Sequence, residues 1–280
     1  MYTRPVTPLS IGGVLDDAIK LYRASFGRCL ILSLIGGILL GATGIYMATQ
    51  MRALGIAPDV TSGSTADPTA ALRLVAGAMG AFFRIYLLIS LVSLLLYSAI
   101  FAQVNDVAQG GPRRSQMDIF ALALRRVPGV FVAAIIFGVA VSIGFVLLFI
   151  PGVFLWGKLQ FFMASVFADD VGGIEALGHS WNATTNNWWR SSTILMVAAI
   201  MIFILELIAG VASGLLLALS GGLHSADLLG LSAAGSIVRV VIYIFILPMV
   251  PAVMLSTYYD MKLRREGSDL AARAKSMQSA

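Results

Sequence analysis

The chain has 280 residues, of which 59% are hydrophobic and only 12% are charged. Soluble domains carry roughly 25% charged residues, so this composition excludes a soluble globular protein and indicates an integral membrane protein. The net charge of +5 would suggest nucleic acid as the partner of a soluble protein. In a membrane protein it is explained by basic residues that collect on the cytoplasmic side, and we expect no nucleic-acid partner.

The first part of the chain predicts an interfacial helix followed by two membrane spans. A helical stripe of apolar residues runs along 11–26, and a first span is expected at about 29–47. A polar, irregular loop follows and ends at Asp67 and Pro68, which are typical of the cap and the first position of a helix. We expect that helix to continue into a second span at about 82–104.

The middle of the chain repeats this pattern. A second apolar stripe along 120–131 leads into a third span at about 130–149. The turn at 150–152 carries no charge, and a fourth span is expected to return at about 153–168. Spans three and four would also fit a re-entrant hairpin. We favour two full crossings, because the charged residues then sort onto the expected sides of the membrane.

The last part begins with the most distinctive stretch of the sequence, 172–195. Ile174, Leu177, Trp181 and Trp188 fall at helical spacing on one face, opposite a polar face. A surface helix of a soluble domain could show the same stripe, but an amphipathic helix that ends in tryptophans and Arg190 before an apolar run is typical of a membrane interface. Spans five and six are expected at about 194–217 and 233–258, the last one kinked by its two prolines.

The distribution of basic residues predicts the topology. Arginines and lysines precede span one, lie between spans two and three, and follow span six, whereas the turns at 150–152 and around His224 contain neither. Both termini are therefore expected in the cytoplasm. The prediction is an all-α membrane protein with six transmembrane helices in three hairpins, each preceded by a cytoplasmic amphipathic helix. Residues 1–270 would form a single polytopic membrane domain, and 271–280 a flexible cytoplasmic tail.

Three charged residues within the spans predict a polar cluster. Counted along their helices, Lys158, Glu206 and Arg239 fall at a similar depth in the outer half of the bundle. A charge at the centre of a membrane helix costs about 2.5–3.5 kcal/mol, so each of these residues should face a partner or a water-filled cavity. We expect the Glu206 carboxylate to lie within about 4 Å of one of the two cations. The cluster would be a structural ion pair or a polar path for an ion or headgroup.

Three segments resemble a known family. PLSIGGVLDDAIKLYRASFG, GGIEALGHSWNATTNNWWR and TYYDMKLRREGSDL are similar to the membrane domain found with bacterial glycerophosphodiester phosphodiesterases and to its stand-alone multi-pass relatives. The resemblance implies a location in the bacterial cytoplasmic membrane and no hydrolytic chemistry, since that activity belongs to a separate soluble domain. Aromatic and charged residues of the last two segments are candidate cytoplasmic contacts for lipids or partners: Trp181, Trp188, Trp189, Arg190, Asp260, Arg264, Arg265 and Glu266.

These observations favour a non-enzymatic membrane protein that organises lipids or partner proteins at its cytoplasmic face. The alternative is a transporter or channel subunit for a small anion or lipid. An intramembrane enzyme is disfavoured, because no serine, histidine and carboxylate converge on one helical face and no metal-ligand cluster is apparent. We expect no catalytic residues, metal or cofactor. The expected partners are membrane lipids, those with anionic headgroups among them, and a membrane protein or a second copy of the chain.

Overall fold

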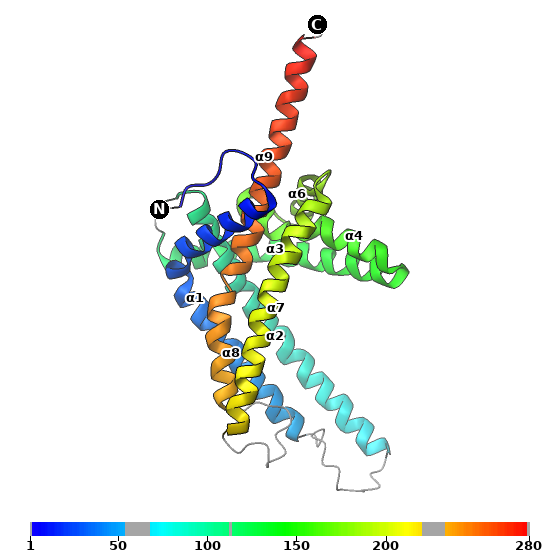
Figure 1. Ribbon diagram of the computed structural model, residues 1–280. Coiled ribbons are helices and arrows are strands. Elements are labelled where there is room, and N and C mark those ends of the chain that lie inside the picture. Colours follow the sequence, from blue (N-terminus) through cyan, green and yellow to red (C-terminus); the bar gives the residue numbers. More distant parts are fainter. Residues whose placement is uncertain (1, 54–67, 112–113, 220–232, 279–280) are drawn as a thin grey trace. The chain divides into compact units, whose positions relative to one another are not determined.

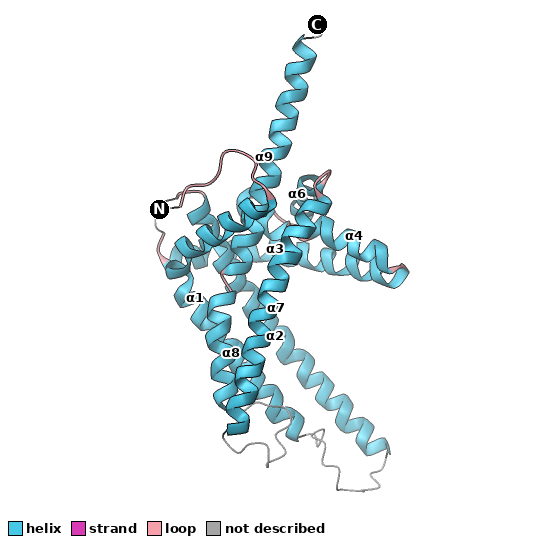
Figure 2. Cartoon of the chain, in the orientation of Figure 1, coloured by secondary structure: helices cyan, strands magenta, loops and turns pink. Residues whose placement is uncertain are grey.

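The described part of the protein is built from helices (Figures 1 and 2). The computed structural model describes residues 2–53, 68–111, 114–219 and 233–278. In these ranges the helices are α1 (Ile11–Ala53), α2 (Pro68–Ala108), α3 (Gln116–Leu147), α4 (Phe149–Leu159), α5 (Phe162–Ala168), α6 (Ile174–Thr184), α7 (Trp188–Leu219), α8 (Ala233–Ile246) and α9 (Met249–Gln278).

The predicted all-α membrane class is confirmed at the level of the helices. Six helical segments of the described chain are long and apolar enough to cross a membrane: Ile11–Thr43, Tyr86–Ala108, Gln116–Leu147, Phe149–Ala168, Trp188–Leu215 and Val240–Gly267. Large apolar side chains lie on their outer surfaces, for example Phe203, which is 66% exposed. Such surfaces are stable when they face lipid rather than water.

The helices form two compact units. Unit 1 comprises 1–33, 95–204 and 245–280, and unit 2 comprises 34–94 and 205–244. In unit 2, α1 and α8 approach closely. An added Cβ on Gly37 would lie 3.2 Å from the carbonyl oxygen of Val240, and one on Gly41 would lie 2.7 Å from a Val240 methyl group. Gly37 and Gly41 are four residues apart and lie on one face of α1, where the absence of side chains lets the two backbones approach.

The start of α1 packs into unit 1. Its buried stripe consists of Val14, Ala18, Leu21 and Cys29, so the inward face lies beside the stripe expected from the sequence. Asp17, a charged residue of the same segment, is 7% exposed and accepts a hydrogen bond from the Tyr2 hydroxyl at 3.0 Å. The N-terminal segment supplies the donor that makes burial of this carboxylate tolerable.

Two of the predicted interfacial segments are not separate helices. Residues 11–26 and 120–131 are continuous with the apolar segments that follow them, in α1 and α3, and Pro128 does not interrupt α3. Only the third segment is a helix of its own, α6. The interfacial position of these segments therefore stays a prediction.

Other boundaries follow the sequence closely. Helix α2 begins at Pro68 and runs on through the second apolar segment, as predicted. The last apolar segment is interrupted at 247–248, between α8 and α9. Pro248 accounts for this break, because its ring removes a donor and crowds the preceding turn. The segment 271–280, predicted as a tail, continues α9 as far as Gln278.

Helices α3 and α4 form a tight antiparallel hairpin (Figure 1). Their axes are close near the tip because two glycines face each other: a Cβ on Gly144 would lie 2.9 Å from the Cα of Gly152. At the base, the Gly173 amide donates to the Gly129 carbonyl at 3.2 Å. Helix α5 follows α4 after two residues, and α6 packs against both helices, with Ser180 donating to the carbonyl of Lys158 at 2.9 Å.

The glycine contact leads to a stability prediction. Gly144→Ala should destabilise the protein by about 1–3 kcal/mol, because the added methyl group meets backbone atoms of α4 that have no room to move. Gly138→Ala in the same helix is the matched control, since its Cβ would meet nothing within 4 Å. The control should be neutral or slightly stabilising. Thermal unfolding of both variants in detergent measures the difference, and equal melting temperatures would contradict the close approach.

Candidate functional site

Besides Asp17, three buried aspartates organise the polar part of unit 1. They are Asp106 near the end of α2, Asp169 directly after α5, and Asp260 in α9, and their side chains are 6%, 8% and 3% exposed. A carboxylate this far from water is stable only with several donors or cations around it. The partners of each aspartate therefore show which parts of the chain are held together.

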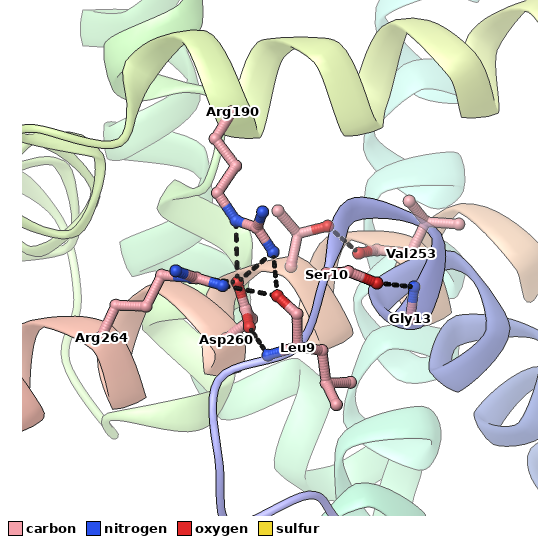
Figure 3. A network of polar contacts seen from close by, with 8 residues as sticks. Leu9, Ser10, Gly13, Arg190, Val253, Asp260 and Arg264 are labelled. Carbon is pink, nitrogen blue, oxygen red and sulfur yellow. Dashed lines mark hydrogen bonds and ion pairs between the residues drawn. The ribbon is translucent and has the colours of Figure 1, made fainter.

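Asp260 is the centre of a network that we call the Asp260 clamp, made of Leu9, Arg190, Asp260 and Arg264 (Figure 3). The Leu9 amide donates to Asp260 Oδ1 at 2.8 Å. Arg190 donates to Oδ2 through Nε at 3.2 Å and through Nη2 at 3.0 Å, and Arg264 donates to the same oxygen through Nε at 3.0 Å. Both guanidinium groups also donate to the Leu9 carbonyl.

The clamp joins three distant segments. Asp260 and Arg264 lie four residues apart on one face of α9, and Arg190 lies in the first turn of α7. All three side chains bond to the backbone of Leu9, which lies just before α1. Two arginines around one carboxylate leave a net positive charge, and the Leu9 carbonyl offsets part of it by accepting from both. These hydrogen bonds and ion pairs hold the start of α7 and the segment before α1 against α9.

Asp169 is the centre of a second group, the Asp169 cluster, with His179, Tyr258 and Lys262. His179 Nδ1 lies 2.7 Å from Oδ2, the Tyr258 hydroxyl donates to Oδ2 at 2.6 Å, and Lys262 donates to Oδ1 at 2.8 Å. Burial alone would raise the pKa of the Asp169 carboxyl, but the hydrogen bonds from His179, Lys262 and Tyr258 outweigh it and hold that pKa below its usual value. Asp169 is therefore ionised at neutral pH.

A hollow of about 710 Å³ opens beside the Asp169 cluster. Its lining comes from the end of α5, from α6 and from α9, and it carries cationic, anionic and amide groups: Asp169, His179, Asn182, Tyr258, Lys262, Arg265 and Glu266. Such a mixed lining suits a small polar or zwitterionic group. Within the described residues, no group of three or more His, Cys, Asp or Glu side chains is placed to hold a metal ion.

The end of α2 contributes the third polar group. Asn105 donates to the Phe167 carbonyl at 2.7 Å and accepts from the Tyr259 hydroxyl at 2.7 Å, so it joins α2 to α5 and α9. Asp106 lies 3.2 Å from Arg114 Nε and 3.6 Å from Arg28 Nη1. Sequence reasoning missed both residues as site candidates. The polar stretch that starts at residue 105 was the available signal, but it reads equally well as an ordinary loop.

The predicted contact tryptophans have different surroundings. Trp181 packs edge-on against Phe154 of α4, with ring centroids 6.0 Å apart. Trp188 donates through Nε1 to the Phe154 carbonyl at 3.3 Å. Trp189 points outward and is 79% exposed. The structure thus brings Trp181 and Trp188 together at α4 and leaves Trp189 on the surface.

The remaining candidates are distributed along α9 and over both units. Arg265 and Glu266 are exposed and line the hollow. Lys158 is buried in unit 1, where its ammonium donates to the Thr185 hydroxyl at 3.2 Å and lies 5.2 Å from the centre of the Trp181 ring. Glu206 is half-buried in unit 2. The side chain of Arg239 lies outside the described residues, so the cluster of Lys158, Glu206 and Arg239 stays a prediction.

The Asp260 clamp should be essential for stability. Asp260→Asn leaves two partly buried guanidinium groups without a carboxylate, and we expect a loss of about 3 kcal/mol in the free energy of unfolding. The control is Asp16→Asn, since Asp16 pairs with Lys20 at 2.6 Å on the surface, with 62% of the Asp16 side chain exposed. An exposed pair of this kind is screened by water and contributes little to stability. Denaturant unfolding of the two variants in the same detergent would refute the clamp if the losses were similar.

The lowered pKa of Asp169 predicts a pH dependence. A carboxyl whose folded-state pKa lies below its unfolded value of about 3.9 stabilises the fold fully above that value, and the contribution is lost as the pH falls through the folded-state pKa. Asp169→Asn should therefore lower stability at pH 7 by about 1–3 kcal/mol, the range for a buried donor left unpaired. The difference in stability between the variant and the wild type should become smaller below pH 4. Melting temperatures between pH 7 and pH 3 test this, and a gap independent of pH would contradict it.

The comparisons with known proteins yield one match. A family model described as "Domain of unknown function (DUF7847)" matches residues 25–259. No curated protein and no solved structure matches the chain. The resemblance to the membrane domain of glycerophosphodiester phosphodiesterases is a separate expectation, which this match does not address. Because the matched residues make up most of the sequence, the chain belongs to the DUF7847 family.

Proposed function

We propose that this protein is a non-enzymatic multi-pass protein of the bacterial cytoplasmic membrane that organises lipids or partner proteins at its cytoplasmic face. In this proposal the polar groups of unit 1 lie on the cytoplasmic side together with both termini. The charge distribution of the sequence supports that orientation, because basic residues accumulate in the segments that join this side.

The observation that carries the proposal is the position of Trp189. Its side chain is 79% exposed, yet its neighbour Arg190 is fixed in the Asp260 clamp. It also packs edge-on against Trp188, with ring centroids 4.7 Å apart. A tryptophan held outward at the start of an apolar helix, next to a charged layer, has the arrangement of an anchor at the depth of lipid headgroups.

The buried acids support a scaffold rather than an enzyme. The carboxylate of Asp260 accepts from donors in three segments, and that of Asp169 accepts from three side chains. Groups engaged in this way hold helix ends in place. The surface around them then offers aromatic and basic side chains to lipid headgroups or to a partner, with each basic residue near an anionic surface contributing about 1 kcal/mol.

The test uses the purified protein in nanodiscs of stated composition. We expect the protein to bind an anionic phospholipid more tightly than a zwitterionic one. Lipid exchange between nanodiscs and native mass spectrometry measure this preference. Arg265→Gln should weaken the preference about fivefold, the equivalent of about 1 kcal/mol. Trp189→Ala should reduce the quenching of tryptophan fluorescence by lipids brominated near the headgroup.

Met117 provides the control for Trp189, since it is also exposed, at 74%, and lies in the first turn of α3. Met117→Ala should leave the tryptophan quenching unchanged. Co-purification of one membrane protein in a fixed ratio would support the partner branch of the proposal. No lipid preference together with no stoichiometric partner would refute both branches.

A further inference from the structure

The α3–α4 hairpin has a long uncharged body and a bare apolar tip. No charged residue lies between Arg126 and Lys158. At the tip, Val146 and Ile150 are 85% and 79% exposed, and the three residues between them are 69–72% exposed. A tip without a polar side chain is poorly suited to the water on the far side of a membrane and well suited to hydrocarbon.

The backbone of the tip is also compatible with hydrocarbon. Only Leu148 lies outside both helices, and its amide still donates to the Gly144 carbonyl at 3.1 Å. The Gly152 amide donates to the Leu148 carbonyl at 3.5 Å. Pro151, in the first turn of α4, has no amide hydrogen that would need a partner. In a bilayer core, where water cannot satisfy the backbone, such a compact turn leaves few groups exposed.

One end of α4–α5 is fixed at a known level of α9. Asp169 follows α5 directly and bonds to Tyr258 and Lys262, which lie one helical turn apart. If α9 crosses the membrane, its charged residues from Asp260 onwards lie in the headgroup layer or in water. Asp169 therefore lies at that same surface of the bilayer.

The middle of α4 lies at the same level. Phe154, the middle residue of α4, accepts a hydrogen bond from Trp188, and two residues later Arg190 bonds to Asp260. Phe154 is thus tied to the first turn of α7, at the turn of α9 that also holds Asp169. Phe154 and Asp169 are separated by about 22 Å along the helices at 1.5 Å per residue. A segment that meets one level of α9 at two points this far apart lies across α9, as Figure 1 shows for α4.

From these contacts we infer that the α3–α4 hairpin lies within the cytoplasmic leaflet and does not cross the membrane. Its partner is the acyl-chain region of that single leaflet. The chain then crosses four times, through α1, α2, α7 and the α8–α9 segment, and both termini stay on the same side. This inference rests on the proposed membrane placement of the chain, and it replaces the two crossings expected for 130–149 and 153–168.

The side of the hairpin that faces α6 supports this placement. Lys158 is the one charged residue between Arg126 and Asp169, and its ammonium bonds to Thr185 in the polar turn after α6. In a full crossing this cation would lie well inside the hydrocarbon. In a hairpin parallel to the surface, the lysine reaches the headgroup layer while its stem stays among apolar groups. A hairpin in one leaflet also adds area to that leaflet alone, which is a physical means of ordering lipids or bending a membrane.

The test is labelling of single cysteines in a Cys29→Ser background. Leu147→Cys and Ile150→Cys place a thiol at the tip, and Ser64→Cys and Ser276→Cys mark the expected outer loop and the cytoplasmic end. An impermeant maleimide is applied to intact spheroplasts and, separately, to inverted vesicles. We expect the tip thiols to stay unlabelled in both and to react fully in sodium dodecyl sulfate. A bimane at Ile150→Cys should be quenched more by lipids brominated deep in the acyl chain than by those brominated near the headgroup.

The outcomes separate the hairpin from the membrane placement. Tip labelling from outside at the rate of Ser64→Cys would establish a full crossing and overturn the inference. Labelling from the cytoplasmic side would place the hairpin in water and overturn it too. If Ser64→Cys and Ser276→Cys react from the same side, the topology under the proposed function itself is wrong. Unchanged elution and helical circular dichroism of each variant exclude misfolding as the cause of a result.

Discussion

The burial of the Asp260 carboxylate is the constraint on which the rest of unit 1 depends. A carboxylate that is 3% exposed loses several kcal/mol of hydration, and this loss is tolerable only if donors surround it. The donors come from the backbone of Leu9, from Arg190 at the start of α7 and from Arg264 one turn further along α9. The N-terminal segment and two long helices must therefore meet at one point before the acid can be buried.

The same stretch of α9 fixes two further helices because consecutive residues of a helix point in different directions. Successive side chains are rotated by about 100°, so Tyr258, Tyr259 and Asp260 face three different neighbours. Tyr258 bonds to Asp169 after α5, Tyr259 bonds to Asn105 of α2, and Asp260 holds the start of α7. Three adjacent residues thus bring the ends of three helices to one level, and the apolar remainder of each helix needs only lipid or a complementary apolar surface.

The sequence could predict the elements but not this convergence. Apolar runs of sufficient length identify the candidate spans, and Pro68 and Pro248 mark a helix start and a break, because these signals act over a few neighbouring residues. The contact between Leu9 and Asp260 joins residues that are 251 positions apart, and no local pattern encodes such a pairing. The depth predicted for Lys158 rested on an assumption about the direction of its helix. Counting residues along α4 gives a depth only if the helix is parallel to the membrane normal, whereas the inferred hairpin lies parallel to the membrane surface.

Basic residues also could not distinguish a crossing hairpin from one embedded in a single leaflet. The rule that cytoplasmic segments are rich in lysine and arginine compares segments on opposite sides of the membrane. The turn of the α3–α4 hairpin has no charged residue, so it satisfies the rule equally well in outer water and in hydrocarbon. Two crossings more or fewer leave both termini on the same side, and the basic residues before α3 and in the second half of α9 stay on the side expected to be cytoplasmic in either case. The evidence that separates the two arrangements therefore comes from tertiary contacts: Trp188 with Phe154 in the middle of α4, and Asp169, directly after α5, with α9.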